Sequence, residues 1–394
     1  MARILFIYKQ FPAPSVGHAG GESLFGLMEA LHRRGHRLAL VARILDEERA
    51  LLPAVEAICE RVITTPHHRS IPGWRPLALA RSYLALRRTA KRALRELRPD
   101  LVHIETTQTA AVLLGLRLPP SSFRTQDVNW FMWQQKAAHA RGLKRLLAQT
   151  MAAVFRVFEP LLCRRHDLIL AISEGDRGLL APVCGNRRPH LLPLVPASFD
   201  DPDAPPTIPP GPPALLFVGA MDRAHNLAGV TWFLDHVWPR IRDALPEGEN
   251  SPARFYIVGG HPPAELRARA GEDHCVVTGF VQDLASWYRS ATVFVSPMLV
   301  AGGLLQKVVD AMALGVPVVA TSVCNHGIGA TPGKHLLTAD TAEEFAAAVL
   351  ALLRDPEARA RLGSAGQHFI QTHYDTEAAI AQWETALIGL QKSQ

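Results

Sequence analysis

The feature that most constrains the fold of this chain is the alternation of short apolar runs with segments of helical spacing. The apolar runs cover 4–8, 38–42, 101–104 and 168–173, and later 215–219, 255–260, 275–280, 293–297 and 317–321. Runs without polar interruption are typical of parallel strands buried on both faces of a sheet. Helical segments between them, such as 22–34, supply the crossovers that parallel strands need. The pattern therefore predicts α/β domains with doubly wound sheets.

A proline-rich stretch near the middle predicts two such domains. Residues 196–213 contain eight prolines in 18 positions, and proline disrupts both helix interiors and central strands. We expect a first domain over 1–200, a linker over 201–213 and a second domain over 214–373. The apolar spacing over 372–390 predicts a further helix at the end of the chain.

Charge differs strongly between the two halves. The chain carries a net charge of +6, but residues 1–200 hold 29 Lys and Arg against 16 Asp and Glu, whereas the remainder holds 13 against 20. Two basic helical segments, 75–98 and 141–165, alternate cations with leucines. Such a surface can lie on an anionic membrane, bind an acidic acceptor or be solvated. No recognised motif supports binding to nucleic acid.

Cysteine usage and the start of the chain favour a cytoplasmic protein. The five cysteines are odd in number, far apart and never in a C-x-x-C pair, which argues against a disulfide framework and a zinc site. No 18-residue run is apolar and uncharged, and no cleavage pattern follows Met1. We therefore expect a soluble protein that can still touch a membrane, with no metal site and no cofactor.

Glycine loops after the apolar runs are the candidate binding sites, because ligands of open parallel sheets lie beyond the carboxyl ends of the strands. After the first run, Gly20 and Gly21 precede a helix, so a ligand can approach the backbone and the free N–H groups at the helix start. The spacing is not that of a dinucleotide fingerprint. A flexible loop with an ordinary helix cap remains an alternative.

The segment 297–321 is the most informative stretch of the second half. A glycine turn at Gly302 and Gly303 leads into a short helix in which Lys307 and Asp310 are three residues apart and share a face. The lysine could hold a diphosphate and the carboxylate could accept hydrogen bonds from ribose hydroxyls. An ordinary surface pair of Lys and Asp is the alternative.

The order of these features resembles the retaining glycosyltransferases of family 4, which have the GT-B fold, over essentially the whole length. The resemblance rests on the loop at 20–21 with Gly35-His36, on the strands at 100–103 and 167–174, and on the segments 217–222, 255–260, 277–283 and 307–321. Each motif is weak alone, but their collinear arrangement is specific.

The resemblance implies an enzyme that moves a sugar from a nucleotide sugar to the hydroxyl of a sugar, lipid-linked or protein acceptor, without a bound metal. The N-terminal domain would hold the acceptor and the C-terminal domain the donor, and the last helix, 374–394, would pack back on the N-terminal domain. Gly20, Gly21, Lys307 and Asp127 would be the catalytic residues. The donor would be bound by Gly219, Arg223, Gly259, Val281, Gly302, Gly303, Leu304, Lys307 and Asp310.

Four positions depart from the pattern of this family. Ala220 and His225 stand where relatives place an Arg and a Lys, with Arg223 nearby. Gly302 stands in place of the first of two glutamates, and Gln126 in place of a histidine, which leaves Asp127 as its nearest ionisable neighbour. A sugar-nucleotide epimerase or hydrolase of the same fold, and a degenerate member that only binds a nucleotide sugar, are therefore the alternatives.

Overall fold

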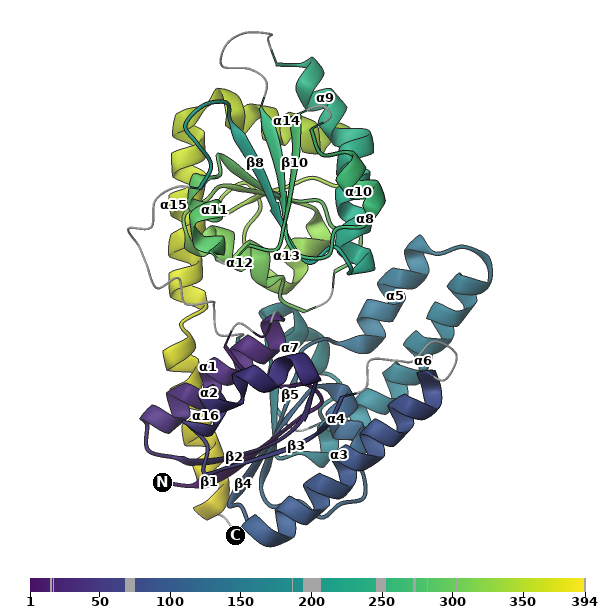
Figure 1. The fold of residues 1–394 in the computed structure, drawn as a ribbon, viewed down its shortest axis with the longest axis vertical. Helices are drawn as coiled ribbons and strands as arrows, with labels where there is room; N and C mark the ends of the chain where they lie inside the picture. Colours follow the sequence, from purple (N-terminus) through teal and green to yellow (C-terminus); the bar gives the residue numbers. More distant parts are fainter. Residues whose placement is uncertain are drawn as a thin grey trace. The chain divides into compact units, whose positions relative to one another are not determined.

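A computed structural model describes residues 1–14, 16, 18–67, 75–185, 187–193, 207–245, 253–271, 274–281, 283–301 and 303–392. The chain forms two compact units (Figure 1). The first comprises Met1–Ala197, Gly302–Leu304 and Thr376–Gln394, and the second comprises Ser198–Ala301 and Leu305–Asp375. Positions 201–206 of the expected linker and the candidate residue Gly302 lie outside the described residues.

The first unit is built on a seven-stranded parallel sheet with the strand order β3-β2-β1-β4-β5-β6-β7. Its strands are β1 (Arg3–Tyr8), β2 (Arg37–Ile44), β3 (Arg61–Pro66), β4 (Leu101–Glu105), β5 (Ser121–Thr125), β6 (Leu168–Ala171) and β7 (His190–Leu191). The strands β1 and β4 are neighbours, so their carboxyl ends bring Tyr8 and Glu105 to the same edge.

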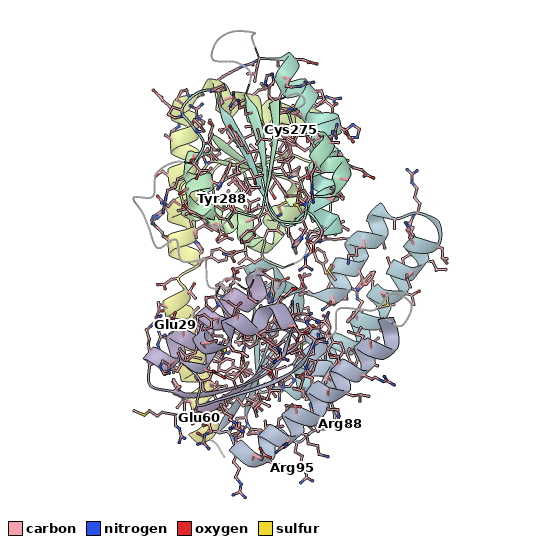
Figure 2. The ribbon with its side chains drawn as sticks, in the orientation of Figure 1. Glu29, Glu60, Arg88, Arg95, Cys275 and Tyr288 are labelled. Atoms are coloured by element: carbon pink, nitrogen blue, oxygen red, sulfur yellow. The ribbon has the colours of Figure 1, made fainter. Side chains whose placement is uncertain are left out.

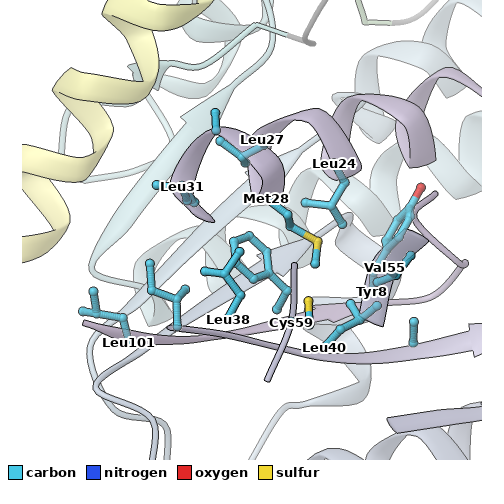
Figure 3. Packing of buried hydrophobic residues seen from close by; sticks show 14 of the residues in the cluster. Tyr8, Leu24, Leu27, Met28, Leu31, Leu38, Leu40, Val55, Cys59 and Leu101 are labelled. Atoms are coloured by element: carbon cyan, nitrogen blue, oxygen red, sulfur yellow. The ribbon is translucent and has the colours of Figure 1, made fainter. Parts of the chain in front are cut away.

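Helices cover both faces of this sheet. They are α1 (Ala19–Arg33), α2 (Leu52–Glu56), α3 (Arg75–Leu97), α4 (Thr107–Val112), α5 (Asn129–His139), α6 (Gly142–Arg165), α7 (Glu174–Leu180) and α16 (Thr376–Lys392), with a 3-10 turn, η1, at Asp46–Leu51. The core on one face comes from α1, α2 and α16, and the core on the other from α3, α4, α6 and α7. In Figure 3, Leu24 and Met28 of α1 extend toward the strand that carries Leu38 and Leu40, β2.

The second unit has a six-stranded parallel sheet with the order β10-β9-β8-β11-β12-β13. Its strands are β8 (Ala214–Val218), β9 (Arg254–Val258), β10 (Cys275–Gly279), β11 (Val293–Ser296), β12 (Val318–Ala320) and β13 (Leu337–Thr338). Its helices are α8 (Ala224–Trp232), η2 (Phe233–Val237), α9 (Trp238–Asp243), α10 (Ala264–Ala268), α11 (Leu284–Ser290), α12 (Gln306–Ala313), α13 (Ser322–Ile328), α14 (Ala342–Arg354) and α15 (Pro356–His373). The ring of Phe233 packs 4.6 Å from that of Phe255 and 5.7 Å from that of Phe345, which joins η2 to β9 and α14.

The two doubly wound parallel sheets predicted from the sequence are confirmed. The structure differs in strand β5, which no apolar run announces: its sequence SSFRT is mostly polar, yet all five residues are buried. It also differs at the end of the chain, where α15 ends at His373 and α16 begins at Thr376, so the expected helix over 372–390 is interrupted.

The cysteines, the surface cations and one apolar helix of the described residues bear on the expectations from the sequence. All five cysteines are buried, and none of them forms a disulfide in the part of the chain that the structure describes. Cations project outward from α3, as Arg88 and Arg95 show in Figure 2. One helix, Gly142–Arg165, is long and apolar enough to cross a membrane, by length and composition.

Candidate functional site

Lys307 lies at the carboxyl end of the second sheet, beside the strands β8 and β11. It is the second residue of α12, and its ammonium donates to Asn226 Oδ1 at 2.7 Å. The same Nζ lies 4.2 Å from the centroid of the Phe217 ring and 4.0 Å from Met298 Sδ. Burial among these groups lowers the pKa of Lys307 to about 7. No carboxylate pairs with this ammonium in the part of the chain that the structure describes.

Asn226 holds Lys307 in place through a polar bridge. Its side-chain Nδ2 donates to the carbonyl of Ala220 at 2.9 Å, while its Oδ1 accepts from Lys307. The bridge runs directly beneath Gly219, where a Cβ would lie 2.7 Å from Asn226 Nδ2 and 2.8 Å from Lys307 Nζ. A side chain at 219 would therefore displace the Asn226 amide or the Lys307 ammonium from this position.

The turns after β8, β9 and β10 are joined by backbone hydrogen bonds. Gly219 N donates to Val258 O at 2.9 Å, and Gly259 N donates to Gly279 O at 3.0 Å. Gly259 has a φ of +151°, and a Cβ there would lie 2.0 Å from Gly219 O. These contacts bring two predicted donor-binding residues, Gly219 and Gly259, to Lys307 through their backbones.

The other predicted donor-binding residues of the second unit have no such contact with Lys307 among the described residues. Arg223 is the N-cap residue of α8, and its half-exposed guanidinium lies 3.9 Å from the carboxylate of Asp222. Val281 is partly buried, two residues beyond β10. Asp310 is buried and accepts a hydrogen bond from Gln306 Nε2 at 2.7 Å. Lys307 and Asp310 thus bind different partners, and the surface pair considered from the sequence is not formed.

In the first unit, Gly20 and Gly21 form the start of α1 at the carboxyl end of β1. His18 caps this helix, because its Nδ1 accepts from Gly21 N at 2.9 Å. A Cβ on Gly20 would lie 2.7 Å from Gln126 Oε1 and 2.9 Å from the Tyr8 hydroxyl. The predicted glycine loop and Gln126, far apart in sequence, therefore meet at one place.

A buried polar network lies below Gln126. Gln126 Nε2 donates to Glu105 Oε2 at 3.2 Å, and Arg124 Nε donates to Glu105 Oε1 at 2.5 Å. His103 contacts the same carboxylate at 3.1 Å and Ser122 Oγ at 2.8 Å. Burial acts to raise the pKa of Glu105, but Arg124 and His103 outweigh it, so the net effect is a lowered pKa. The network fixes an ionised carboxylate under the Gly20 loop.

The sequence did not reveal the network of Glu105, Arg124 and His103. The only sequence signal for this network was the position of its residues in the strands. Glu105 is the last residue of β4, and Arg124 is in the penultimate position of β5. Burial of a charged pair is tolerated where both partners are hydrogen-bonded. Polar residues inside strands at this edge were therefore the available signal.

Asp127 lies among buried carboxyls rather than in the Glu105 network. Burial raises the pKa of Asp127 to about 6 and that of Asp176 to about 7. Glu159, whose pKa is also raised by burial, accepts from Asn129 N at 2.9 Å and from Asn129 Nδ2 at 2.7 Å. These carboxyls repel one another, which adds to the effect of burial.

Gly303 and Leu304, two further predicted donor-binding residues, belong to the first unit. Gly303 has a φ of +60°, and a Cβ there would lie 2.4 Å from Gln126 O and 3.1 Å from Asp127 Oδ1. Leu304 is buried. Gly303 therefore lies beside Gln126 and Asp127.

Two family models match the chain. Residues 20–194 match the model described as Glycosyltransferase Family 4, and residues 212–355 match the model described as Glycosyl transferases group 1. The chain is 22% identical over 405 residues, 96% of its own length and 97% of the relative's, to an uncharacterized 44.6 kDa protein in the cps region of Klebsiella pneumoniae. It is 29% identical over 174 residues, 43% of this chain and 44% of the relative, to a phosphatidyl-myo-inositol mannosyltransferase of Mycobacterium leprae.

Solved structures share the fold at low sequence identity. Sucrose-phosphate synthase of Thermosynechococcus elongatus has a TM-score of 0.76 at 19% identity, with full coverage of both chains. Anabaena HepE in complex with UDP and glucose has a TM-score of 0.68 at 15% identity, covering 99% of this chain and 100% of that one. The two parallel-sheet units thus have the GT-B architecture of glycosyltransferases.

Proposed function

Because the chain belongs to the family 4 glycosyltransferases of group 1, we propose that it moves a sugar from a nucleoside diphosphate sugar to an acceptor hydroxyl, with retention of the anomeric configuration. Family membership makes the chain a glycosyltransferase. The donor class, the stereochemical course and independence of metal ions and cofactors are the proposal.

The ammonium of Lys307 is the observation that carries this proposal. It lies in a poorly solvated position against a glycine-lined backbone, with one amide oxygen and no carboxylate as partner among the described residues. A diphosphate leaving group develops negative charge as the glycosidic bond breaks, and a positioned cation stabilises that charge. Complexes of HepE with UDP and with UDP-glucose support a nucleotide sugar as donor.

The remaining donor contacts belong to the same proposal. Gly219 and Gly259 let the backbone approach the diphosphate beside Lys307, and Arg223 adds a second cation one turn from Asn226. We assign Val281 to the base and Asp310 to the ribose. In this proposal the ammonium of Lys307 takes the part of a metal ion at the diphosphate.

The first unit supplies the acceptor side. We assign Gly20 and Gly21 to the surroundings of the reacting carbon, and Asp127, mostly ionised at neutral pH, can accept a hydrogen bond from the acceptor hydroxyl. The name of the mannosyltransferase relative and the cps region of the Klebsiella relative support a glycolipid or polysaccharide acceptor. We place the enzyme in the cytoplasm.

A binding experiment tests the donor assignment. UDP, GDP, TDP and ADP, with their sugars, are added to the full chain, and the thermal midpoint is measured. Lys307→Ala is expected to weaken binding of the preferred nucleotide about 10- to 150-fold, because a charged hydrogen bond of ~1.5–3 kcal/mol is lost. Lys334→Ala, which removes an exposed lysine of the same unit, is the matched control and should bind normally.

Two outcomes contradict the proposal. If no nucleotide raises the midpoint, the chain does not bind a donor of this class. If the donor is consumed without acceptor, giving free sugar or an epimerised nucleotide sugar, the reaction is not transfer. The anomeric configuration of the transferred sugar, read from NMR coupling constants of the product, decides between retention and inversion.

A further inference from the structure

The outer face of α6 is an apolar stripe exposed to solvent. Six large apolar side chains on this helix are between 52% and 81% exposed: Leu143, Leu146, Leu147, Val154, Val157 and Leu161. At 100° per residue they fall on one side of the helix. A soluble monomer rarely exposes such a continuous set, and it marks a site of contact with a membrane or a protein.

The opposite face of α6 is fixed to the first unit. Leu162 and Cys163 are buried in its core, and Glu159 is buried with hydrogen bonds to Asn129 and to the Trp130 N–H. Although α6 meets the length and composition of a spanning helix, only one of its faces is free. Crossing a bilayer would take the buried Glu159 carboxyl away from its donors. The helix is therefore suited to lying in the plane of a membrane surface.

The charge of the segment that carries the stripe selects an anionic partner. The segment 141–165 contains six cations and one acid, and that acid is the buried Glu159. The cations are Arg141, Lys144, Arg145, Arg156, Arg164 and Arg165. A second copy of this chain on the stripe would bring cations against cations, whereas an anionic bilayer complements them.

A groove on another face of α6, about a third of a turn around the helix from the stripe, is suited to a phosphate group. It lies between α5 and α6, has a volume of about 390 Å³ and contains Arg145, Arg156, Gln134 and Gln149 on its rim. Trp130 lines it, with the Arg156 guanidinium 4.9 Å from the Trp130 ring centroid. The buried Trp130 Nε1 has no hydrogen-bond partner among the described residues. Two guanidiniums and unused donors next to an apolar surface match a phospholipid headgroup.

We propose that α6 is an interfacial membrane helix, whose stripe enters the acyl-chain boundary of a bilayer while the groove between α5 and α6 binds the phosphate of an anionic phospholipid. This inference goes beyond the proposed transfer reaction and does not depend on it. Of the two basic helices of the first unit, α3 and α6, the proposal assigns membrane contact to α6.

Vesicle co-sedimentation of the full chain tests the proposal. Binding is expected to phosphatidylglycerol-containing vesicles, and more weakly to phosphatidylcholine vesicles. The double variant Val154→Asp/Val157→Asp is expected to lower partitioning to both vesicle types at least ~10-fold, because two apolar side chains no longer enter the interface. Arg145→Gln/Arg156→Gln is expected to lower binding about 25-fold on anionic vesicles only, at about fivefold per charge.

Controls separate this proposal from its alternatives. Leu84→Asp changes a leucine of α3 that is 51% exposed and should leave binding unchanged, as should Arg361→Gln on α15. Circular dichroism and the thermal midpoint establish that each variant is folded. Inorganic phosphate at millimolar concentration should not release the protein, because the headgroup is held together with the stripe.

Several results would overturn the proposal. Unchanged vesicle binding in the stripe variant, or equal loss in Leu84→Asp, would show that α6 is not the docking element. Release by phosphate alone would identify the groove as a site for a soluble anion. A dimer that dissociates in the stripe variant, with no vesicle binding by the wild type, would identify a second copy as the occupant.

Discussion

Nucleotide binding should depend steeply on pH, because the ammonium of Lys307 is poorly solvated before the donor arrives. The pKa of Lys307 is lowered to about 7 by burial, so half of the molecules carry a neutral amine at pH 7. A diphosphate beside Nζ replaces the missing solvation with negative charge and raises the pKa again. Binding above pH 7 therefore takes up a proton.

The size of the effect follows from the fraction of molecules that are competent to bind. That fraction is about one half at pH 7, one in eleven at pH 8 and one in a hundred at pH 9. Kd should therefore rise ~5-fold by pH 8 and up to ~50-fold by pH 9, a rise that the loss expected for Lys307→Ala limits. The diphosphate is already ionised in this range and adds little. Lys307→Arg keeps its charge across the range and should show a nearly flat Kd.

Isothermal titration calorimetry measures both quantities. The preferred nucleoside diphosphate is titrated at pH 7, 8 and 9, and at pH 8 in buffers of different ionisation enthalpy, which report an uptake of about 0.9 proton per molecule bound. A Kd that changes by less than twofold between pH 7 and 9, or the absence of proton uptake at pH 8, would refute the reasoning. Lys334→Ala should behave as the wild type.

Four further predictions concern the metal, the backbone and stability. Transfer should survive excess EDTA, and loss of turnover that Mg²⁺ restores would contradict this. Gly219→Ala should weaken nucleotide binding at least ~10-fold with little change in thermal midpoint, because its Cβ would displace Asn226 or Lys307; normal calorimetric affinity would disprove it. Asp176 has a folded pKa of about 7, above its unfolded value, so its contribution to the free energy of unfolding should be full below pH 4 and lost as the pH rises to 7. Urea unfolding at pH 4.5 and 7.5 should show a smaller pH effect in Asp176→Asn. Trp383→Ala should destabilise the first unit by about 3–5 kcal/mol in the same assay; a change under 1 kcal/mol would be inconsistent with its burial.

Sequence reasoning was most successful where a single local pattern determines the structure. Mostly apolar runs identified β1, β2 and β4, because strands buried on both faces have few polar positions. The same rule missed β5, whose Arg124 is buried only because Glu105, on the neighbouring strand, accepts its hydrogen bond. Such a pair becomes visible only when the strand order is known.

The candidate site also combines features that a local sequence pattern predicts with features that it does not. The glycine loop and Lys307 were predicted from their places after strands, and the structure puts both at the carboxyl ends of the sheets. The partner of Lys307 is Asn226, 81 positions earlier in the chain, and no spacing rule links the two. Likewise, α1 begins at Ala19, before the expected position 22. This earlier start follows from the cap that His18 provides, although histidine is not among the residues favoured at the N-cap.

The last helix has a consequence for how the enzyme is made. Trp383 of α16 is buried in the first unit, with its ring 5.2 Å from that of His103, which in turn contacts Glu105. During synthesis the early strands leave the ribosome long before this helix, so the first unit has to wait for the end of the chain to complete its core. A chain that stops before α16 would lack part of this support. Synthesis of α16 is thus needed before the first unit can complete its core.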